Sequence, residues 1–174
     1  DWKAGGRYPV IAEYPGNIFF VPTCYSTGRP EQCVIGYGMT KGSGAIWVSL
    51  PFVDRAAGTI AEDGWGDADA TADFAVRMVE EICRAFGGDA DNVVLTGFSR
   101  GAIACGYIGL RDDRIAKLWK GFHACQHYDG DGWRGATMPG AMERARRFRG
   151  RAIFHTDNSA EAFGALMSER SEER

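Results

Sequence analysis

The stretch that decides the fold is Asn92-Val93-Val94-Leu95-Thr96-Gly97-Phe98-Ser99-Arg100-Gly101-Ala102. Its first part, Val93 to Leu95, is short, apolar and largely β-branched, which is typical of a buried strand. The next part, Gly97 to Gly101, fits the pattern G-x-S-x-G. Residues 102–110 are small and apolar, as expected of a helix packed on a sheet. Strand, sharp turn and helix in this order predict a nucleophile elbow.

The predicted turn has a definite chemistry. Its two glycines, Gly97 and Gly101, are needed where neighbouring backbones come too close for a Cβ atom. The turn would lift Ser99 Oγ clear of the sheet and place the Arg100 N–H at a helix N-terminus, where it stabilises an oxyanion. The simpler alternative is a glycine-rich turn in which the serine only caps a helix.

The composition sets the class of protein. A chain of 174 residues predicts a single domain with a substantial core, and 45% hydrophobic with 25% charged residues is ordinary for a globular protein. The net charge of −3 argues against a nucleic-acid-binding surface. No apolar run reaches the length that spans a bilayer. The chain begins at Asp1 without a recognisable signal peptide, as expected of a processed product or a fragment.

The five cysteines are an odd number, so at least one is unpaired within the chain. Cys24 and Cys33 bracket a polar loop and would close a small disulfide, which implies a secreted or periplasmic location. Two loop thiols are the alternative. Cys83 and Cys105 fall on apolar faces of predicted helices and are expected in the core.

Strands and helices are predicted to alternate along the chain. The expected strands are 10–14, 44–52, 93–95, 118–125 and 151–156. The expected helices are 69–86, 102–110, 139–148 and 159–170, and the main loops are 18–41, 54–67 and 126–135. This order predicts an α/β fold, with a mostly parallel sheet and helices on both faces.

The loop after the first predicted strand contains Pro15-Gly16-Asn17. Enzymes with an elbow take their second oxyanion donor from a glycine-containing loop that follows an earlier strand. The backbone N–H groups of Gly16 and Asn17 are therefore the candidates, and a plain turn is the alternative.

With these elements in place, residues 8–16 and 86–102 resemble the α/β-hydrolase fold. More narrowly, they are similar to bacterial esterases that resemble polyhydroxyalkanoate depolymerases and feruloyl esterases. The sequence Gly-Phe-Ser-Arg-Gly-Ala also occurs in phospholipase-like bacterial effectors. The resemblance covers about residues 8–157 and implies a serine esterase that needs no cofactor and acts on a small-molecule or polymer ester.

The resemblance also implies a catalytic triad of Ser99, an acid and a histidine, in that order. The acid position follows the strand 151–156 and corresponds to Asp157. The histidine should lie further on, but no histidine follows His155. The opening strands of the fold are also not found before Trp2, so the domain is expected to be incomplete at both ends.

Three histidines are available as a base within the chain: His123, His127 and His155. Each is predicted near the carboxyl end of a strand, where ligands gather in parallel sheets. Asp129 or Asp131 would orient His155 if the acid came from the earlier strand. The remaining possibility is a base that lies outside this chain.

A metal-dependent hydrolase is a further hypothesis. His123, Cys125, His127 and Asp129 alternate with a period of two and are residue types that bind zinc. The alternative is that two of these residues are histidines that line the active site and that the Cys125 thiol is buried in the core. The segment 129–132 is similar to part of a calcium loop but lacks its terminal glutamate, which argues against calcium.

Aromatic residues are predicted on the loops around the serine. They either form an aromatic or acyl pocket or anchor the loops on the sheet. These residues are Tyr14, Trp65, Tyr128 and Trp133. The sequence thus favours a serine esterase and leaves an inactive, hydrolase-like binding module as its main rival.

Overall fold

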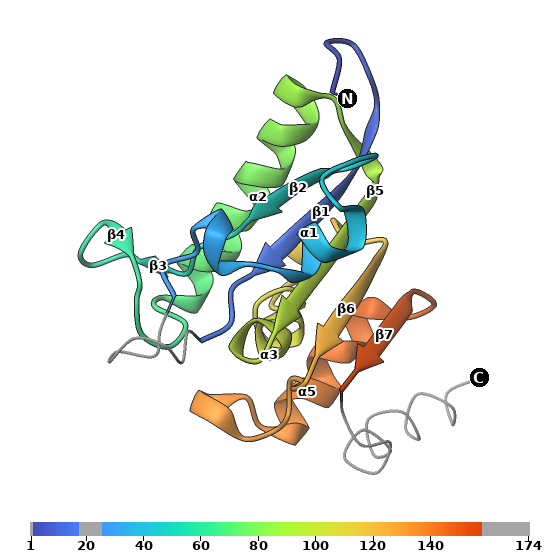
Figure 1. Ribbon diagram of the computed structural model, residues 1–174. Helices are drawn as coiled ribbons and strands as arrows, with labels where there is room; N and C mark the ends of the chain where they lie inside the picture. Colours follow the sequence, from blue (N-terminus) through green and yellow to red (C-terminus); the bar gives the residue numbers. More distant parts are fainter. Residues whose placement is uncertain (1, 18–25, 158–174) are drawn as a thin grey trace.

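Five parallel strands form the centre of the structure, a computed structural model that describes residues 2–17 and 26–157 (Figure 1). The strand order in the sheet is β2-β1-β5-β6-β7. The strands are β1 (Tyr8–Tyr14), β2 (Ile46–Ser49), β5 (Gly88–Phe98), β6 (Gly121–Cys125) and β7 (Ala152–Thr156). The predicted parallel sheet is confirmed, and the elbow strand β5 lies at its centre. The predicted helix 159–170 lies outside the described residues.

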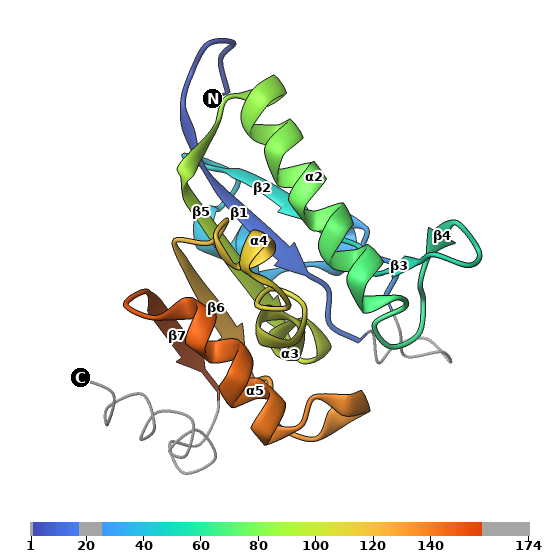
Figure 2. The ribbon, with the colours of Figure 1, turned by 180° about the vertical axis from the view of Figure 1, so that it is seen from behind.

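Helices cover both faces of the sheet, but unequally. Figure 2 shows one face, which is covered by α2 (Ala68–Phe86), α3 (Arg100–Tyr107), α4 (Asp113–Ala116) and α5 (Met138–Ala145). Of the helices in residues 2–17 and 26–157, one lies on the other face: α1 (Ile35–Thr40), which packs beside β1, β2 and β5. Short 3-10 turns complete the set at Pro30–Gln32, Trp133–Gly135 and Arg146–Phe148. Across the described ranges, no helix has the length and apolar character that crossing a membrane requires.

The longest helix, α2, follows from its sequence. Its apolar residues recur every three or four positions, and that stripe is buried against the sheet. The Asp67 carboxylate accepts a hydrogen bond from the Ala70 N–H at 2.8 Å, and Gly87 ends the helix with φ at 74°. The predicted helix 69–86 is confirmed, except that Phe86 is 53% exposed.

The second predicted strand differs from the structure. Of the expected range 44–52, only β2 joins the sheet, as an edge strand that is half-buried. A strand covered on both faces was expected, but α1 reaches only part of this edge. The following residues turn away and form the antiparallel hairpin of β3 (Val53–Asp54) and β4 (Thr59–Ile60), most of which falls in the predicted loop 54–67.

The predicted disulfide is wrong for Cys33, which is a buried free thiol. Its sulfur lies 3.0 Å from Ser49 Oγ at the end of β2, and Ser49 donates in turn to the Gly28 carbonyl at 2.6 Å. Burial raises the pKa of Cys33 to about 12. Cys24 lies outside the described residues. The thiol therefore helps to pack the loop against the edge strand, and the inferred oxidising compartment loses its basis.

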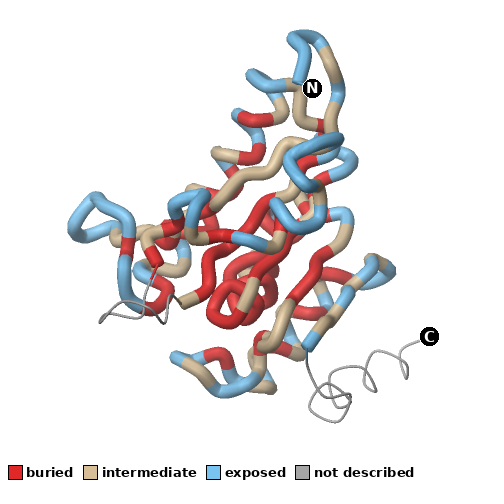
Figure 3. The backbone as a smooth tube through the Cα atoms, in the orientation of Figure 1, coloured by how far each residue is buried: buried red, intermediate tan, exposed pale blue. Residues whose placement is uncertain are grey.

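Burial is concentrated in the central strands and in the elbow helix (Figure 3). Val10, Ala12 and Leu95 have no exposed surface, and they pair or pack across β1 and β5. Their side chains are covered by α2 and α3. The sheet therefore holds the carboxyl ends of β1 and β5 rigidly side by side, which is where the elbow begins.

A buried carboxylate fixes α1 on the sheet. Glu13 of β1 is 1% exposed and accepts hydrogen bonds from the N–H groups of Val34, Ile35 and Gly36 at 3.0, 3.0 and 2.7 Å. The Trp47 indole N–H donates to the same carboxylate at 2.9 Å. The four donors replace the water that the buried acid lost, and the negative charge of Glu13 stabilises the positive N-terminal end of α1.

We expect Glu13→Ala to lower the free energy of unfolding by about 3 kcal/mol, because it leaves one buried and three partly buried N–H groups without their acceptor. Urea denaturation followed by tryptophan fluorescence measures this change. Glu80→Ala, an exposed change on α2, is the matched control and should shift stability by less than about 0.5 kcal/mol. Equal stability of the two variants would contradict the role given to Glu13.

Candidate active site

Ser99 lies at a strained turn between β5 and α3. Its φ of 53° and ψ of −116° lie in a region that residues with a side chain rarely adopt. The turn is held by the Ser99 N–H, which donates to the Cys125 carbonyl of β6 at 3.1 Å. The Ser99 carbonyl accepts from the N–H groups of Ala102 and Ile103 at 3.0 and 3.2 Å, which starts the helix. The alternative of an ordinary capping serine is not supported, because the Ser99 side chain makes no cap hydrogen bond.

The glycines around Ser99 allow three backbone segments to meet. A Cβ at Gly101 would lie 2.0 Å from the Tyr14 carbonyl oxygen, and one at Gly97 would lie 2.3 Å from the Gly101 carbonyl carbon. A Cβ at Gly16 would lie 2.7 Å from the Phe98 carbonyl oxygen. The end of β1 therefore packs directly on the elbow, as expected when a second oxyanion donor comes from this loop.

The structure brings the predicted oxyanion donors to the same edge of the sheet. Arg100 is the first residue of α3, where a helix leaves N–H groups outside its own hydrogen-bond pattern. Gly16 follows β1 and lies against Phe98, the residue before Ser99. Asn17 is next to it, and its Oδ1 is buried with no hydrogen-bond partner among residues 2–17 and 26–157.

The Arg100 side chain has a function that the sequence reasoning missed. It is 1% exposed, and its guanidinium donates to the carbonyls of Gly64 and Ser26 at 3.1 and 3.0 Å. Its Cζ lies 4.4 Å from the centre of the Phe52 ring. An arginine flanked by small and apolar residues, at the start of a predicted buried helix, was the available signal.

His123 is held on the sheet face opposite α3 and α5. Its Nδ1 lies 3.0 Å from Thr96 Oγ1 and its Nε2 lies 2.8 Å from Thr156 Oγ1, so both ring nitrogens bind hydroxyl groups. The side chain is buried, and burial lowers the pKa of His123. These bonds cross from β5 to β7 and give His123 a structural role in the sheet.

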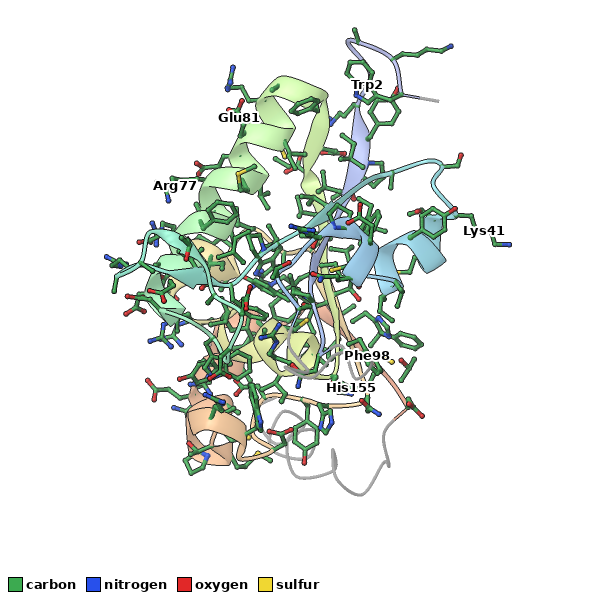
Figure 4. The ribbon with its side chains drawn as sticks, turned by 60° about the vertical axis from the view of Figure 1, so that its left-hand side comes forward. Trp2, Lys41, Arg77, Glu81, Phe98 and His155 are labelled. Carbon is green, nitrogen blue, oxygen red and sulfur yellow. The ribbon has the colours of Figure 1, made fainter. Side chains whose placement is uncertain are left out.

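His155 points to the other face of the sheet. It lines a narrow apolar cavity of about 20 Å³ between the strands and the helices α3 and α5, together with Ala102 and Ala124. Burial, with His123 nearby, lowers the pKa of His155 to about 4. His155 belongs to β7, which is separated from the elbow strand by β6. Figure 4 shows His155 and Phe98 at the end of the molecule opposite Trp2.

His127 is paired with Asp131, one of the two acids that the sequence analysis expected to orient His155. Its Nδ1 lies 3.1 Å from Asp131 Oδ2, and the imidazole is 45% exposed. His127 follows Cys125, whose carbonyl binds the Ser99 N–H, by two residues. The other candidate acid, Asp129, instead forms a buried two-bond ion pair with Arg144 at 2.7 and 2.8 Å.

The side chains proposed to bind zinc do not converge. The strand ends at Cys125, and Gln126 turns the chain with φ at 79°, so the alternation expected through residue 129 is broken. His123 faces two threonines, and Asp129 faces Arg144. Within the described part of the chain, no group of three histidine, cysteine or acidic residues is arranged to hold a metal.

Asp157 directly follows β7, with φ at 59° and an exposed side chain. Its neighbour Thr156 accepts a hydrogen bond from the Gln126 N–H at 2.9 Å, which ties this end of β7 to β6. Asp157 therefore lies at the same edge of the sheet as Ser99, two strands away.

The predicted aromatic residues divide into two groups. Tyr14 is not on a loop: it ends β1, has no exposed surface and stacks on Phe52 at 5.4 Å. Trp65 packs on Tyr107 of α3 at 5.0 Å and on Trp133 at 4.7 Å. These contacts support the interpretation that the aromatic residues anchor the loops on the sheet. Tyr128 differs, because its ring meets that of His155 edge-on at 6.2 Å.

Gly101→Ala should destabilise the fold by about 3 kcal/mol or more, because the new methyl group would overlap the Tyr14 carbonyl. Chemical denaturation measures the change. Gly38→Ala in α1 is the control, since a Cβ there meets nothing within 4 Å. That control should raise stability by about 0.5–1 kcal/mol through helix propensity. A Gly101→Ala protein as stable as the control would rule out the close contact.

His155 should stay neutral in the folded protein until the pH falls to about 4, whereas its ordinary value is 6.5. The unfolded chain therefore binds this proton first, and the stability contributed by the neutral ring is complete above about pH 6.5 and is lost as the pH falls toward 4. NMR titration of the imidazole C–H signals, assigned with His155→Gln, measures the midpoint. A midpoint near 6.5 would refute the burial of this ring.

Comparisons with known proteins identify the fold. No protein-family description matches the sequence, and no curated protein matches it. Among solved structures, YahD with malic acid has a TM-score of 0.51 and 13% identity, over 100% of this chain and 98% of that chain. The Solibacter usitatus glucuronoyl esterase has a TM-score of 0.58 and 13% identity, over 97% of this chain and 62% of that chain.

The Bacillus cereus carboxylesterase has a TM-score of 0.52 and 12% identity, over 99% of this chain and 90% of that chain. These similarities extend over nearly the whole chain at low identity, so they bear on the fold. Together with the parallel sheet and the elbow at its centre, they show that this chain has the α/β-hydrolase fold.

Proposed function

We propose that this protein is a serine hydrolase that cleaves a carboxylic ester through Ser99. The observation that carries the proposal is the strained backbone of Ser99, at φ 53° and ψ −116°, between the central strand and a buried helix. Such strain persists where the surrounding structure enforces it, and it accompanies function. Here it places a hydroxyl beside the N-terminus of α3.

In the proposed reaction, Ser99 Oγ attacks the ester carbonyl carbon and forms a tetrahedral intermediate. The N–H of Arg100, with that of Gly16 or Asn17, binds the oxyanion. Collapse of the intermediate expels the alcohol and leaves an acyl group on Ser99, which water then removes. The packing of Gly16 on Phe98 supports this assignment, because it keeps the two donor segments together.

We assign the base to His127, with Asp131 as the carboxylate that orients it. Of the three histidines, His127 is the one whose ring is half-exposed and paired with an acid, at 3.1 Å. The loop that carries it begins after Cys125, whose carbonyl accepts the Ser99 N–H. Both ring nitrogens of His123 bind threonine hydroxyl groups, and the His155 ring lines the apolar cavity between the sheet and the helices α3 and α5.

The neighbours support ester hydrolysis as the reaction class, since two of them are named as a glucuronoyl esterase and a carboxylesterase. The rival is a hydrolase-like binding module. One observation favours it: among residues 2–17 and 26–157, no side chain is hydrogen-bonded to Ser99 Oγ. Catalytic hydrogen bonds are often long or poorly aligned before substrate binds, so the serine hydrolase is kept as the proposal.

A fluorophosphonate probe tests the nucleophile. We expect it to label Ser99, and Ser99→Ala should lose both labelling and hydrolysis of p-nitrophenyl acetate. Mass spectrometry of the labelled peptide identifies the residue. An unlabelled serine in a folded wild-type protein would favour the binding module.

His127→Gln should lower kcat by about 10²–10⁴-fold, the contribution of a positioned base. Asp131→Asn should lower kcat by a smaller factor, because it leaves the imidazole in place but removes its orienting partner. The control is Asp91→Asn, an exposed acid paired with Arg7 at the other end of the sheet. If His127→Gln keeps wild-type kcat while Ser99→Ala loses it, the serine assignment stands and the base lies elsewhere.

A further inference from the structure

The loop that carries His127 and Asp131 is fixed at both ends. At its start, the Gln126 N–H donates to the Thr156 carbonyl of β7 at 2.9 Å. At its far end, Asp131 forms an isolated backbone bridge with Thr137, the residue before α5. His127 lies between these two anchors, so its position relative to Asp131 depends on what holds the middle of the loop.

The middle of the loop is held by a buried ion pair. The Arg144 guanidinium of α5 donates from Nε and Nη2 to the two carboxylate oxygens of Asp129, at 2.7 and 2.8 Å. The two side chains are 15% and 7% exposed. Asp129 lies two residues after His127 and two residues before Asp131. The place of this one carboxylate therefore bears on both members of the proposed pair.

The surroundings of the ion pair leave it little freedom to move. Gly106 of α3 lies so close that a Cβ there would be 2.4 Å from the Asp129 Cβ. The Arg144 Cζ lies 4.8 Å from the centre of the Tyr107 ring, also on α3. The pair thus attaches the loop to α3 and α5, which lie side by side (Figure 2). Without the guanidinium, Asp129 would be a buried charge that has lost its counter-ion, which favours its movement toward water.

We propose that Arg144 is a positioning residue for this loop, and that it keeps the His127 imidazole hydrogen-bonded to Asp131. The inference rests on the proposed function, in which His127 is the base. In this bond Nδ1–H donates to the carboxylate, which leaves the lone pair of Nε2 available to accept the Ser99 proton. When Asp129 is released, the loop shifts and the carboxylate no longer sets which nitrogen carries the proton.

Arg111 provides a matched control. It also forms an ion pair, with Asp69 of α2, and its Cζ lies 5.5 Å from the centre of the same Tyr107 ring. Its side chain is 28% exposed. Arg111→Lys therefore disturbs a similar ion pair and a similar ring contact, but it leaves the pair of Arg144 and Asp129 in place.

The first measurement does not depend on activity. A long-range proton–nitrogen NMR spectrum at alkaline pH, with the His127 signals assigned by His127→Gln, reports which ring nitrogen carries the proton. We expect the Nδ1–H tautomer in the wild type and in Arg111→Lys. In Arg144→Lys, the signals should move toward those of Asp131→Ala, which lacks the orienting carboxylate. A wild-type spectrum in Arg144→Lys would overturn the proposal.

A second variant keeps the test decisive if Arg144→Lys does not fold. Asp129→Asn combined with Arg144→Met removes both charges, so no buried charge is left without a counter-ion. The same change of tautomer at His127 is expected, because the two-bond attachment of the loop is lost. A wild-type spectrum in this double variant would contradict the role given to Arg144.

The second measurement is kinetic, with p-nitrophenyl acetate as substrate. Arg144→Lys should lower kcat by about three- to tenfold and change KM by less than about twofold, since it disturbs the base and not substrate binding. Combined with Asp131→Ala, it should cause no further loss, because both changes act on one hydrogen bond. Losses that multiply in the double variant would show that Arg144 acts independently of Asp131 and would refute the proposal. Arg111→Lys should keep wild-type kcat.

Failure of the proposed function shows differently from failure of this inference. It appears as a wild-type protein that the fluorophosphonate does not label, or as a His127→Gln variant with wild-type kcat. In either case the NMR comparison still decides the role of Arg144, because it reports directly on the hydrogen bond between His127 and Asp131.

Discussion

The contact between Gly101 and the Tyr14 carbonyl is the constraint on which the rest of the structure depends. No atom beyond hydrogen fits there, since a Cβ would lie 2.0 Å from the oxygen. The close approach joins the end of β1 to the start of α3 and leaves Ser99 in a conformation that costs energy. The strain is maintained because the carboxyl-terminal parts of both strands, Val10 to Tyr14 and Val93 to Gly97, are paired and largely buried.

Buried charges hold the loops around this point. Glu13 collects four N–H donors and fixes α1, whereas Arg100 donates to loop carbonyls and fixes the segments near Ser26 and Gly64. Asp129 and Arg144 pair between the loop after β6 and α5. In each case, a charged group inside the protein is satisfied by several directed bonds, which specify one loop arrangement better than apolar packing would.

The candidate site combines rigid and exposed parts. Ser99, Arg100 and Gly16 are set by packing around the central strand, while His127 and Asp131 lie on a loop with partial exposure. This division suits acyl transfer, in which the oxyanion donors must be preorganised and the base must exchange protons with water. The histidines differ in role. His123 binds two threonines across the sheet and has a structural role, whereas His127 is the proposed base.

The sequence by itself determined the elbow, the parallel sheet and α2, because each is encoded by local signals: two glycines around a serine, apolar runs and a stripe at helical spacing. It did not determine which acid meets which histidine, that Cys33 is a free thiol, or that Arg100 is buried. Those features join residues far apart in the chain, and Gln126 changes the direction of its loop through one backbone angle. Only the tertiary structure decided them, because side-chain partners depend on where distant backbones meet.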